Sequence, residues 1–417
     1  MLQVTRVFVA TVLVLALVVA ACGDGDTEDA AETTAAPTTT AAPETTAAPE
    51  TTAAPETTAA PETTAAPAGG LGAVIMELPT TISNAEQAAE ATWVVWDEDS
   101  CSFVETDDHP DFYQAVLREA GDSGYRFAWT PEDNVFDTLI VANESFRVAA
   151  AASGADVTEF DNQYPSEEQP LVVADLVVQH DPDVVLSMNV LANLNPAIMS
   201  QYKEACIPAV AHSVPHEGQP FFGGGEWYAV GRAQAEYLIA VAEGRGWTTG
   251  DVDVLLCAHS AFVQDRTSPY ASIIGFREVV KESFDVGDDN IHELECPSDI
   301  VTDQANVADW LTAHPDTQNI MGFGINDLRT LGMVNALRES GRAETSIAGG
   351  VGLSQESVGP LCANDPTFLT SVDFVPQLWG EYGIAIAQDI AEGNPIPSEI
   401  YPQATVVDAE TIDQAKC

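Results

Sequence analysis

The chain has 417 residues, of which 46% are hydrophobic, and 65 acidic residues outnumber 14 basic ones, giving a formal charge of −51. A surface of this sign repels nucleic acid and anionic lipid head groups, so neither is an expected partner. The length exceeds what one ordinary hydrophobic core needs and suits two.

The N-terminal sequence predicts an export signal. Residues 7–21 form an apolar run behind Arg6. The run is too short to span a bilayer comfortably and is typical of the hydrophobic region of a signal peptide. It ends in "VVAAC", which resembles the lipobox of bacterial lipoproteins, where the signal is removed before a lipid-modified cysteine. We therefore expect a lipoprotein signal at 1–21 and lipidation of Cys22. The alternative is an ordinary signal peptide with a structural Cys22.

The next segment, residues 22–70, is predicted to be a tether. Residues 32–67 are six copies of "ETTAAP", the second with Thr38 in place of glutamate. Proline at every sixth position blocks helix and sheet, and no residue can anchor a core. As an extended spacer the repeats could reach on the order of 100 Å. The sequence thus predicts a domain held at the extracytoplasmic face of the cell membrane by a lipid anchor.

Strands and helices alternate from Gly124 onward, which indicates parallel sheets covered on both faces. The predicted strands are 125–130, 155–160, 182–189, 207–212, 252–259, 291–296, 319–326, 346–352 and 368–374. The predicted helices are 136–154, 166–180, 195–206, 227–243, 270–283, 304–313 and 328–340. The pattern restarts after an irregular stretch at 214–226, so we predict an α/β fold of two doubly wound parallel-sheet lobes.

Several motifs occur in a recognisable order: "ASGADVTEFD", "ACIPAVAHSVP", "GRAQAEYLIAVAEGRG", "SIIGFREVV", "GFGINDLRTLG" and "AQDIAEGNPIP". Over roughly residues 124–415 this set resembles the ribose/galactose-type (type I) periplasmic binding proteins, the sugar-binding components of ABC transporters. Effector domains of lac-repressor-like regulators share the pattern, but a regulator needs a DNA-binding headpiece where this chain has a signal and a tether.

The resemblance implies two lobes joined by three hinge strands, with a ligand between them. Lobe one would comprise 124–215 and 376–402, and lobe two 216–375 and 403–417. Residues 71–123 depart from the family, and we expect them to form an added unit on lobe one. This unit would contain a strand in "TWVVWDEDSC" and a helix in "DFYQAVLREAG".

Cysteine usage fits an exported protein, where disulfides form. Besides Cys22 there are six cysteines, and the lobe assignment implied by the resemblance places two in lobe one and four in lobe two. The implied pairs are Cys101–Cys206, Cys257–Cys296 and Cys362–Cys417. No CxxC motif occurs, which argues against a zinc ribbon or redox site.

Ligands of open α/β sheets lie beyond the carboxyl ends of the strands. Polar and aromatic residues at those ends suit a neutral polyol, whose hydroxyls form hydrogen bonds while its C–H faces lie on aromatic rings. The candidate ligand-binding residues are Trp129, Asn134, Phe136, Asn162, Asn189, His212, Arg266, Asn326, Asp327, Asp373 and Phe374.

Asp327 is the firmest candidate. An Asp at a helix start is as often simply an N-cap, but the resemblance implies that this Asp of an "ND" pair contacts sugar hydroxyls. Two departures alter the pocket: Ser272 stands where the family has an arginine, and His212 where it has an acidic residue. Arg266 could reach the pocket instead of the missing arginine.

Other motifs favour ordinary structural roles. His212 and His216 could suggest a metal, but Pro215 breaks the spacing that would bring both rings together. "GGG" at 223–225 lacks the Lys-Ser/Thr of a phosphate loop, and hydrolase signatures are missing from the sequence. We expect no metal, no cofactor and no enzymatic activity.

These features predict a monomeric, lipid-anchored solute-binding protein that passes a small polar ligand, such as a sugar, to an ABC transporter permease. The alternative is a receptor that presents its liganded form to a sensor kinase or another surface signalling protein.

Overall fold

A computed structural model describes residues 75–76, 81–119, 124–223, 227–260, 262, 264, 269–402 and 404–417. The predicted signal and tether, Cys22 and Arg266 therefore lie outside the described residues. In the described parts of the chain, no helix is both long and apolar enough to cross a bilayer.

A six-stranded sheet forms the centre of lobe one, in the order β17-β10-β9-β8-β6-β7, with every pair parallel. Its strands are β6 (Arg126–Thr130), β7 (Asp156–Glu159), β8 (Val184–Met188), β9 (Ala209–His212), β10 (Phe221–Phe222) and β17 (Glu399–Ile400). Every residue of β8 and β9 is buried, as expected for parallel strands covered on both faces.

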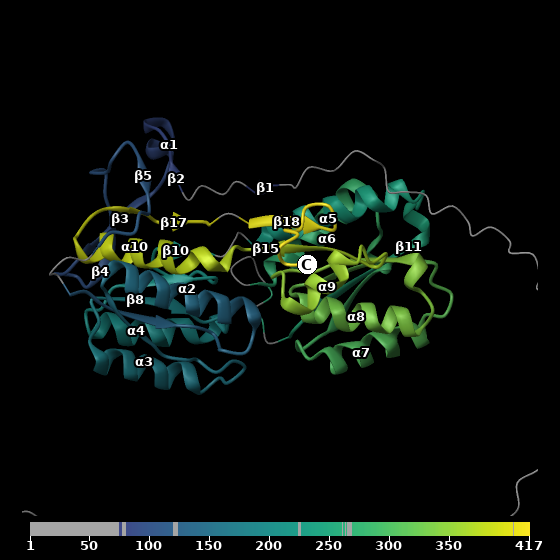
Figure 1. Ribbon diagram of the computed structural model, residues 1–417, viewed down its shortest axis with the longest axis horizontal. Helices are drawn as coiled ribbons and strands as arrows, with labels where there is room; N and C mark the ends of the chain where they lie inside the picture. The colour runs from purple at the N-terminus through teal and green to yellow at the C-terminus, as the bar shows by residue number, and fades with distance from the viewer. Residues whose placement is uncertain are drawn as a thin grey trace, which may run out of the picture. The chain divides into compact units, whose positions relative to one another are not determined.

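Helices cover both faces of this sheet (Figure 1). On one face α3 (Gln169–His180) and α4 (Asn195–Glu204) pack against Ala128, Val185 and Ala209. On the other lie α2 (Asp137–Ser153) and α10 (Trp379–Ala391). These two helices touch closely at Gly380, where a Cβ atom would come within 2.2 Å of the Ser145 backbone. A glycine is therefore required for α10 to reach α2.

A seven-stranded sheet forms the centre of lobe two, in the order β1-β18-β15-β14-β13-β11-β12. The strands are β1 (Ile75–Met76), β11 (Val252–Ala258), β12 (Ile291–Glu295), β13 (Asn319–Gly324), β14 (Ser346–Gly349), β15 (Phe368–Asp373) and β18 (Ala404–Asp408). The five strands from β11 to β15 are parallel, whereas β18 pairs antiparallel with β15, and β1 pairs antiparallel with β18 at the edge.

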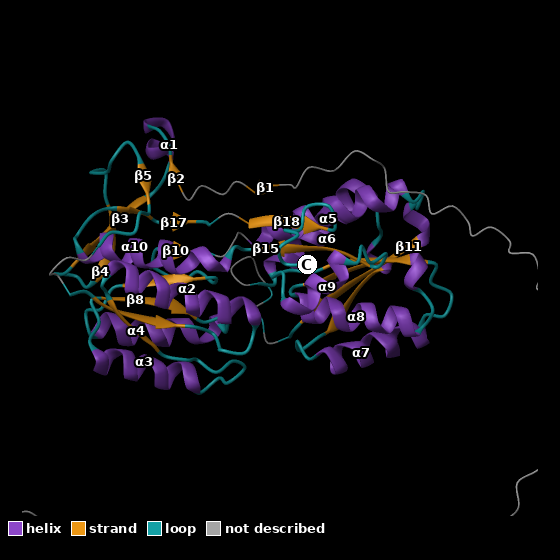
Figure 2. Cartoon of the chain, viewed as in Figure 1, coloured by secondary structure: helices purple, strands orange, loops and turns teal. Residues whose placement is uncertain are grey.

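Five helices flank this second sheet (Figure 2). Helices α5 (Trp227–Gly244) and α6 (Ala271–Phe284) cover one face, and α7 (Ile300–Ala313), α8 (Asp327–Glu339) and α9 (Gln355–Cys362) cover the other. The predicted α/β fold with two parallel-sheet lobes is confirmed. The predicted strands and helices from residue 124 onward occur at the expected places, with ends shifted by a few residues.

The boundary between the lobes differs from the prediction. We expected lobe one to end at residue 215 and the following stretch to be irregular. However, Phe221 and Phe222 form β10, which pairs with β9 and β17 in the sheet of lobe one. Both rings are buried, so this short strand extends the core of lobe one.

The added unit contains β2 (Thr81–Ile82), α1 (Ala85–Glu90), β3 (Trp93–Asp97), β4 (Ser102–Glu105) and β5 (Tyr113–Gln114). The strand predicted in "TWVVWDEDSC" is confirmed as β3, which pairs with β16 (Ile396–Pro397). In contrast, β1 joins the sheet of lobe two, so the prediction that all of 71–123 belongs to lobe one is wrong for β1.

The helix predicted in "DFYQAVLREAG" is also wrong, since the described residues of this stretch, 111–119, are not helical. Tertiary contacts override the local pattern here. Tyr113 is buried against Trp93, and its hydroxyl donates to Asp389 at 3.0 Å. Arg118 adds a 2.9 Å ion pair with Asp389. These contacts bind the extended segment to α10 of lobe one.

Three disulfides join Cys101 to Cys206, Cys257 to Cys296 and Cys362 to Cys417. They match the pairs that the resemblance implied. Cys101–Cys206 links the added unit to the end of α4, whereas the other two lie within lobe two.

Replacing Cys101 and Cys206 together with serine should loosen the added unit and lower the free energy of unfolding by about 2–4 kcal/mol. Limited proteolysis with mass spectrometry should then show faster cleavage within 81–119. The matched control, Cys362→Ser with Cys417→Ser, also loses a disulfide but should keep 81–119 protected. Equal cleavage of this segment in both variants would contradict the assigned attachment.

Candidate functional site

The carboxyl ends of strands from both sheets open onto one pocket with a volume of about 400 Å³. This size lies within the range of small-molecule sites. Lobe one contributes Glu132, Val135, Phe136, Asp137, Thr138, Leu139, Tyr164, Met188, Val190, Ser213 and Trp379. Lobe two contributes Trp227, Phe262, Pro269, Ser298, Ile325, Asn326, Asp327, Leu328, Arg329, Val351, Gly352, Ser354, Glu356 and Phe374.

The start of α2 forms two hydrogen bonds with lobe two at the edge of this pocket. The Thr138 hydroxyl donates to the Gly352 carbonyl at 3.0 Å. The Gln355 backbone N–H donates to the Asp137 carboxylate at 3.1 Å. Both lobe-one residues belong to the first turn of α2, which directly follows the loop after β6. The start of α2 is therefore one part of lobe one that contacts lobe two.

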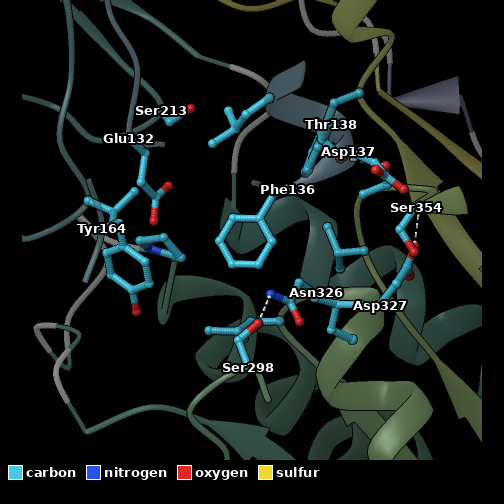
Figure 3. A pocket seen from close by; sticks show the side chains of 18 of the residues that line it. Glu132, Phe136, Asp137, Thr138, Tyr164, Ser213, Ser298, Asn326, Asp327 and Ser354 are labelled. Carbon is cyan, nitrogen blue, oxygen red and sulfur yellow. Dashed lines mark hydrogen bonds between the residues drawn. The ribbon is translucent and has the colours of Figure 1, made fainter. Parts of the chain in front are cut away.

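Aromatic rings line much of the pocket. Phe136 lies near the centre of the view in Figure 3, with Glu132 and Tyr164 on one side and Asp137 and Ser354 on the other. Trp227 packs edge-on against Phe374, with 5.3 Å between ring centroids, and its indole N–H donates to the Ser213 carbonyl at 2.8 Å. Rings fixed in this way can hold the C–H face of a ligand.

Asn326 and Asp327 both line the pocket, and their side chains form different hydrogen bonds within the protein. Asn326 is the N-cap of α8, because its side-chain oxygen accepts from the Arg329 N–H at 3.0 Å. Its amide nitrogen donates to Ser298 at 2.7 Å (Figure 3). Asp327 accepts from the Ser354 N–H and the Ser371 hydroxyl, each at 2.7 Å.

The Asp327 carboxylate is almost inaccessible, with 1% of the residue exposed, and burial raises its pKa to about 6. Its two oxygens tie the loop after β14 to β15, so part of its hydrogen-bonding capacity is used within the protein. Contact between this carboxylate and a ligand stays a prediction.

Polar groups absent from the predicted set lie at another end of the pocket, namely Glu132 and Tyr164 of lobe one and Arg329 of lobe two. Burial and the neighbouring Asp133 raise the pKa of Glu132 to about 8, against the opposing effect of Arg329. Desolvation lowers the pKa of Arg329, while Tyr164, Asp303 and Glu132 oppose that shift. The three side chains therefore lie within electrostatic reach of one another across the lobes.

Four predicted ligand residues lie instead in the interior of lobe one. The Trp129 indole donates to Asn143 at 2.7 Å and stacks on Phe146. The Asn162 amide donates to the Met188 carbonyl at 2.8 Å, and the Asn189 amide donates to Asn195 Oδ1 at 2.7 Å. These side chains build the core or hold the loops after the strands, and none belongs to the pocket lining.

His212 is the fourth of these interior residues. It is fully buried among Trp129, Phe222 and Trp379, and desolvation lowers its pKa to about 3. A residue two positions after the core residue Val210 on the same strand points to the same helix-covered face. The ring is therefore a neutral core group, and the neighbouring Ser213 lines the pocket instead.

Of the remaining predicted residues, Phe136 and Phe374 line the pocket, whereas Asn134 and Asp373 do not. Asn134 donates to Asp161 at 3.0 Å. Asp373 pairs with Lys416 at 3.0 Å and accepts from the Val375 N–H at 2.8 Å. Among the residues with described positions, no cluster of three or more His, Cys, Asp or Glu side chains could hold a metal ion.

Comparison with protein families finds a match to the periplasmic binding protein domain over residues 127–395, more than half of the chain. The chain belongs to the periplasmic binding protein family. This is a family of binding proteins and not of enzymes, as predicted. A comparison with curated proteins found no match.

Solved structures with the same fold support the assignment of the two lobes. A glucose-galactose binding protein from Geobacillus stearothermophilus aligns with a TM-score of 0.58 at 16% identity, covering 69% of this chain and 99% of that one. A myo-inositol-bound ABC transporter solute-binding protein from Bacillus halodurans aligns with a TM-score of 0.60 at 16% identity, covering 71% and 99%. A glycerol-bound ABC transporter solute-binding protein from Mycobacterium smegmatis aligns with a TM-score of 0.59 at 18% identity. The alignment covers 69% of this chain and 95% of that one. At these identities the likeness shows the fold alone.

The raised pKa of Glu132 predicts a pH dependence of stability. The Glu132 carboxyl in the folded state, with its pKa of about 8, keeps its proton well above the ordinary glutamate pKa of 4.5, at which the unfolded chain releases it. The contribution of Glu132 to the free energy of unfolding therefore decreases as pH rises through this window, by at most about 1.4 kcal/mol per pH unit.

Glu132→Gln removes this titration, so the variant should gain stability relative to wild type between pH 5 and pH 8. Urea denaturation at several pH values measures the difference. Glu144→Gln, at an exposed position of α2, should show no such trend. A constant difference between Glu132→Gln and wild type would show that this carboxyl titrates normally.

Proposed function

We propose that this protein is a lipid-anchored extracytoplasmic solute-binding protein that captures a small polar ligand, a sugar or related polyol, and delivers it to an ABC transporter permease. The observation that carries the proposal is the pocket at the carboxyl ends of both sheets. Its walls combine aromatic rings with hydroxyl, amide, carboxyl and guanidinium groups from both lobes.

Chemistry of this kind suits a hydroxyl-rich ligand. Phe136 can lie against C–H groups, while Asn326, Ser298 and Tyr164 offer groups that donate or accept hydrogen bonds. Solved relatives of the same fold were crystallised with myo-inositol and glycerol, and another with D-allose. These ligands support a polyol as the class to test first.

Binding would act through the hinge. A ligand that touches both lobes is bound more tightly by the closed arrangement and therefore stabilises it. Contacts such as Thr138 to Gly352 then form part of the closed surface that a permease recognises. No bond is made or broken, so recognition and closure are the whole of the activity.

Membrane attachment rests on the N-terminal sequence. A lipid on Cys22, followed by the "ETTAAP" repeats, would hold the two lobes away from the bilayer while keeping them near a permease. We propose that the protein acts there as a monomer.

Isothermal titration with glycerol, myo-inositol, D-galactose, D-allose and L-arabinose tests ligand capture. At least one should bind with a dissociation constant in the micromolar range or below. Phe136→Ala should weaken that binding at least tenfold because it removes an aromatic wall of the pocket. A tenfold loss corresponds to about 1.4 kcal/mol of binding free energy. The control variant Phe112→Ala should leave the affinity unchanged, because this residue is 53% exposed on the added unit and does not line the pocket. No binding by any of these compounds would contradict the proposal.

Labelling of growing cells with a fatty acid tests the anchor. The wild-type protein should incorporate the label and remain with the membrane fraction. Cys22→Ser should lose the label and leave the membrane fraction, while Cys101→Ser with Cys206→Ser should keep both properties. Retention of the label by Cys22→Ser would contradict lipidation at this residue.

A further inference from the structure

Arg329 has a feature that the fold does not explain. It lies in the first turn of α8, is only 2% exposed and lines the pocket. Its Nε donates to the Cys296 carbonyl at 2.6 Å, and the guanidinium carbon lies 5.5 Å from the centre of the Phe262 ring. Its Nη2 has no hydrogen-bond partner among the described residues. A buried N–H without a partner costs free energy, so this donor is available to a ligand.

Tyr164 faces the same space from lobe one with a second unused group. Its hydroxyl oxygen is buried and makes no hydrogen bond of normal geometry with the residues that the structure places, although it lies close enough to the Arg329 guanidinium to interact with it. Figure 3 shows Tyr164 and Glu132 together on one side of Phe136. Both residues line the pocket and interact electrostatically with Arg329. Polar groups from both lobes thus converge on one end of the pocket.

The charge of Arg329 is balanced from within its own lobe. Asp303, on α7, is fully buried, and neither of its oxygens has a hydrogen-bond partner among the described residues. Its main favourable interaction is electrostatic attraction to Arg329. Because this acid offsets the guanidinium and Glu132 lies opposite, the end of the pocket has no excess of positive charge for an anion.

We propose that Arg329, Tyr164 and Glu132 form a subsite that binds neighbouring hydroxyls of a neutral polyol and rejects the carboxylate of the corresponding sugar acid. Arg329 donates from Nη2 to one ligand oxygen. The Tyr164 hydroxyl and the Glu132 carboxyl, both from lobe one, form hydrogen bonds with the neighbouring hydroxyl of the ligand. The inference rests on the proposed function and specifies which groups would bridge the lobes.

Discrimination against the acid follows from the same arrangement. A ligand carboxylate at this place would face the carboxyl of Glu132. Arg329 is the one cation among the described pocket residues, and its positive charge is already offset by Asp303. Desolvating an anion beside acidic groups is unfavourable. A neutral ligand hydroxyl can donate one hydrogen bond and accept another. It can therefore accept from the guanidinium of Arg329 and bond with the Tyr164 hydroxyl or the Glu132 carboxyl.

Calorimetry with matched pairs tests this subsite. The probes are D-galactose with D-galacturonate, D-glucose with D-glucuronate, and myo-inositol, each titrated into the full-length protein. Wild type should bind at least one neutral compound, and its acidic counterpart should bind at least tenfold more weakly. Arg329→Met should weaken binding of that neutral compound at least tenfold.

The matched control is Arg338→Met, which removes an exposed arginine from the same helix and should change affinity less than twofold. Tyr164→Phe loses only the hydroxyl and should weaken binding about threefold to tenfold. If Arg329→Met fails to fold, Tyr164→Phe alone tests whether the subsite binds the ligand.

The outcomes separate the two proposals. If a neutral compound binds and both Arg329→Met and Tyr164→Phe bind it as wild type does, the subsite is wrong while the proposed function stands. Tighter binding of an acid than of its neutral partner would overturn the assigned ligand class. If wild type binds neither the neutral compounds nor the acids, the proposed function fails and the subsite with it.

Discussion

Parallel strands fix where this protein can hold a ligand, because all strands of a parallel run end at the same edge of their sheet. In lobe one β6, β8 and β9 end there, and in lobe two β11, β13 and β14 do so. Helices cover both faces of each sheet, so the faces cannot serve as binding surfaces. The loops at the strand ends remain, and those of both lobes line a single pocket.

Hydrogen bonding divides the polar side chains around that pocket into two kinds. Asn326 caps α8, and Asp327 ties the loop after β14 to β15, so both help to hold the site in shape. Arg329 and Tyr164 each keep a buried polar atom without a partner among the described residues. Since buried polar groups in proteins are normally satisfied, the second kind marks the end of the pocket where we propose that a ligand supplies a partner.

Sequence patterns predicted the alternation of strands and helices well, because apolar periodicity reports burial directly. They predicted the site only in part. Phe136, Asn326, Asp327 and Phe374 lie in the pocket, but Trp129 and His212 still belong to the helix-covered face of their strands. Tyr164 lies in the loop after β7, and Arg329 lies in the first turn of α8. Neither residue stands at the end of a strand, so a search of strand ends could not identify them. The wrong helix at 111–121 has a tertiary cause, since Tyr113 packs on Trp93.

The central claim is that two lobes close on a small polyol held between them. Spin labels at Val148 on α2 and Val301 on α7, positions 60% and 75% exposed, report the distance between the lobes by pulsed electron resonance. With a neutral polyol that calorimetry shows to bind, the account predicts a shorter and narrower distance distribution than without it. An unchanged distribution at saturating ligand would contradict closure around the pocket.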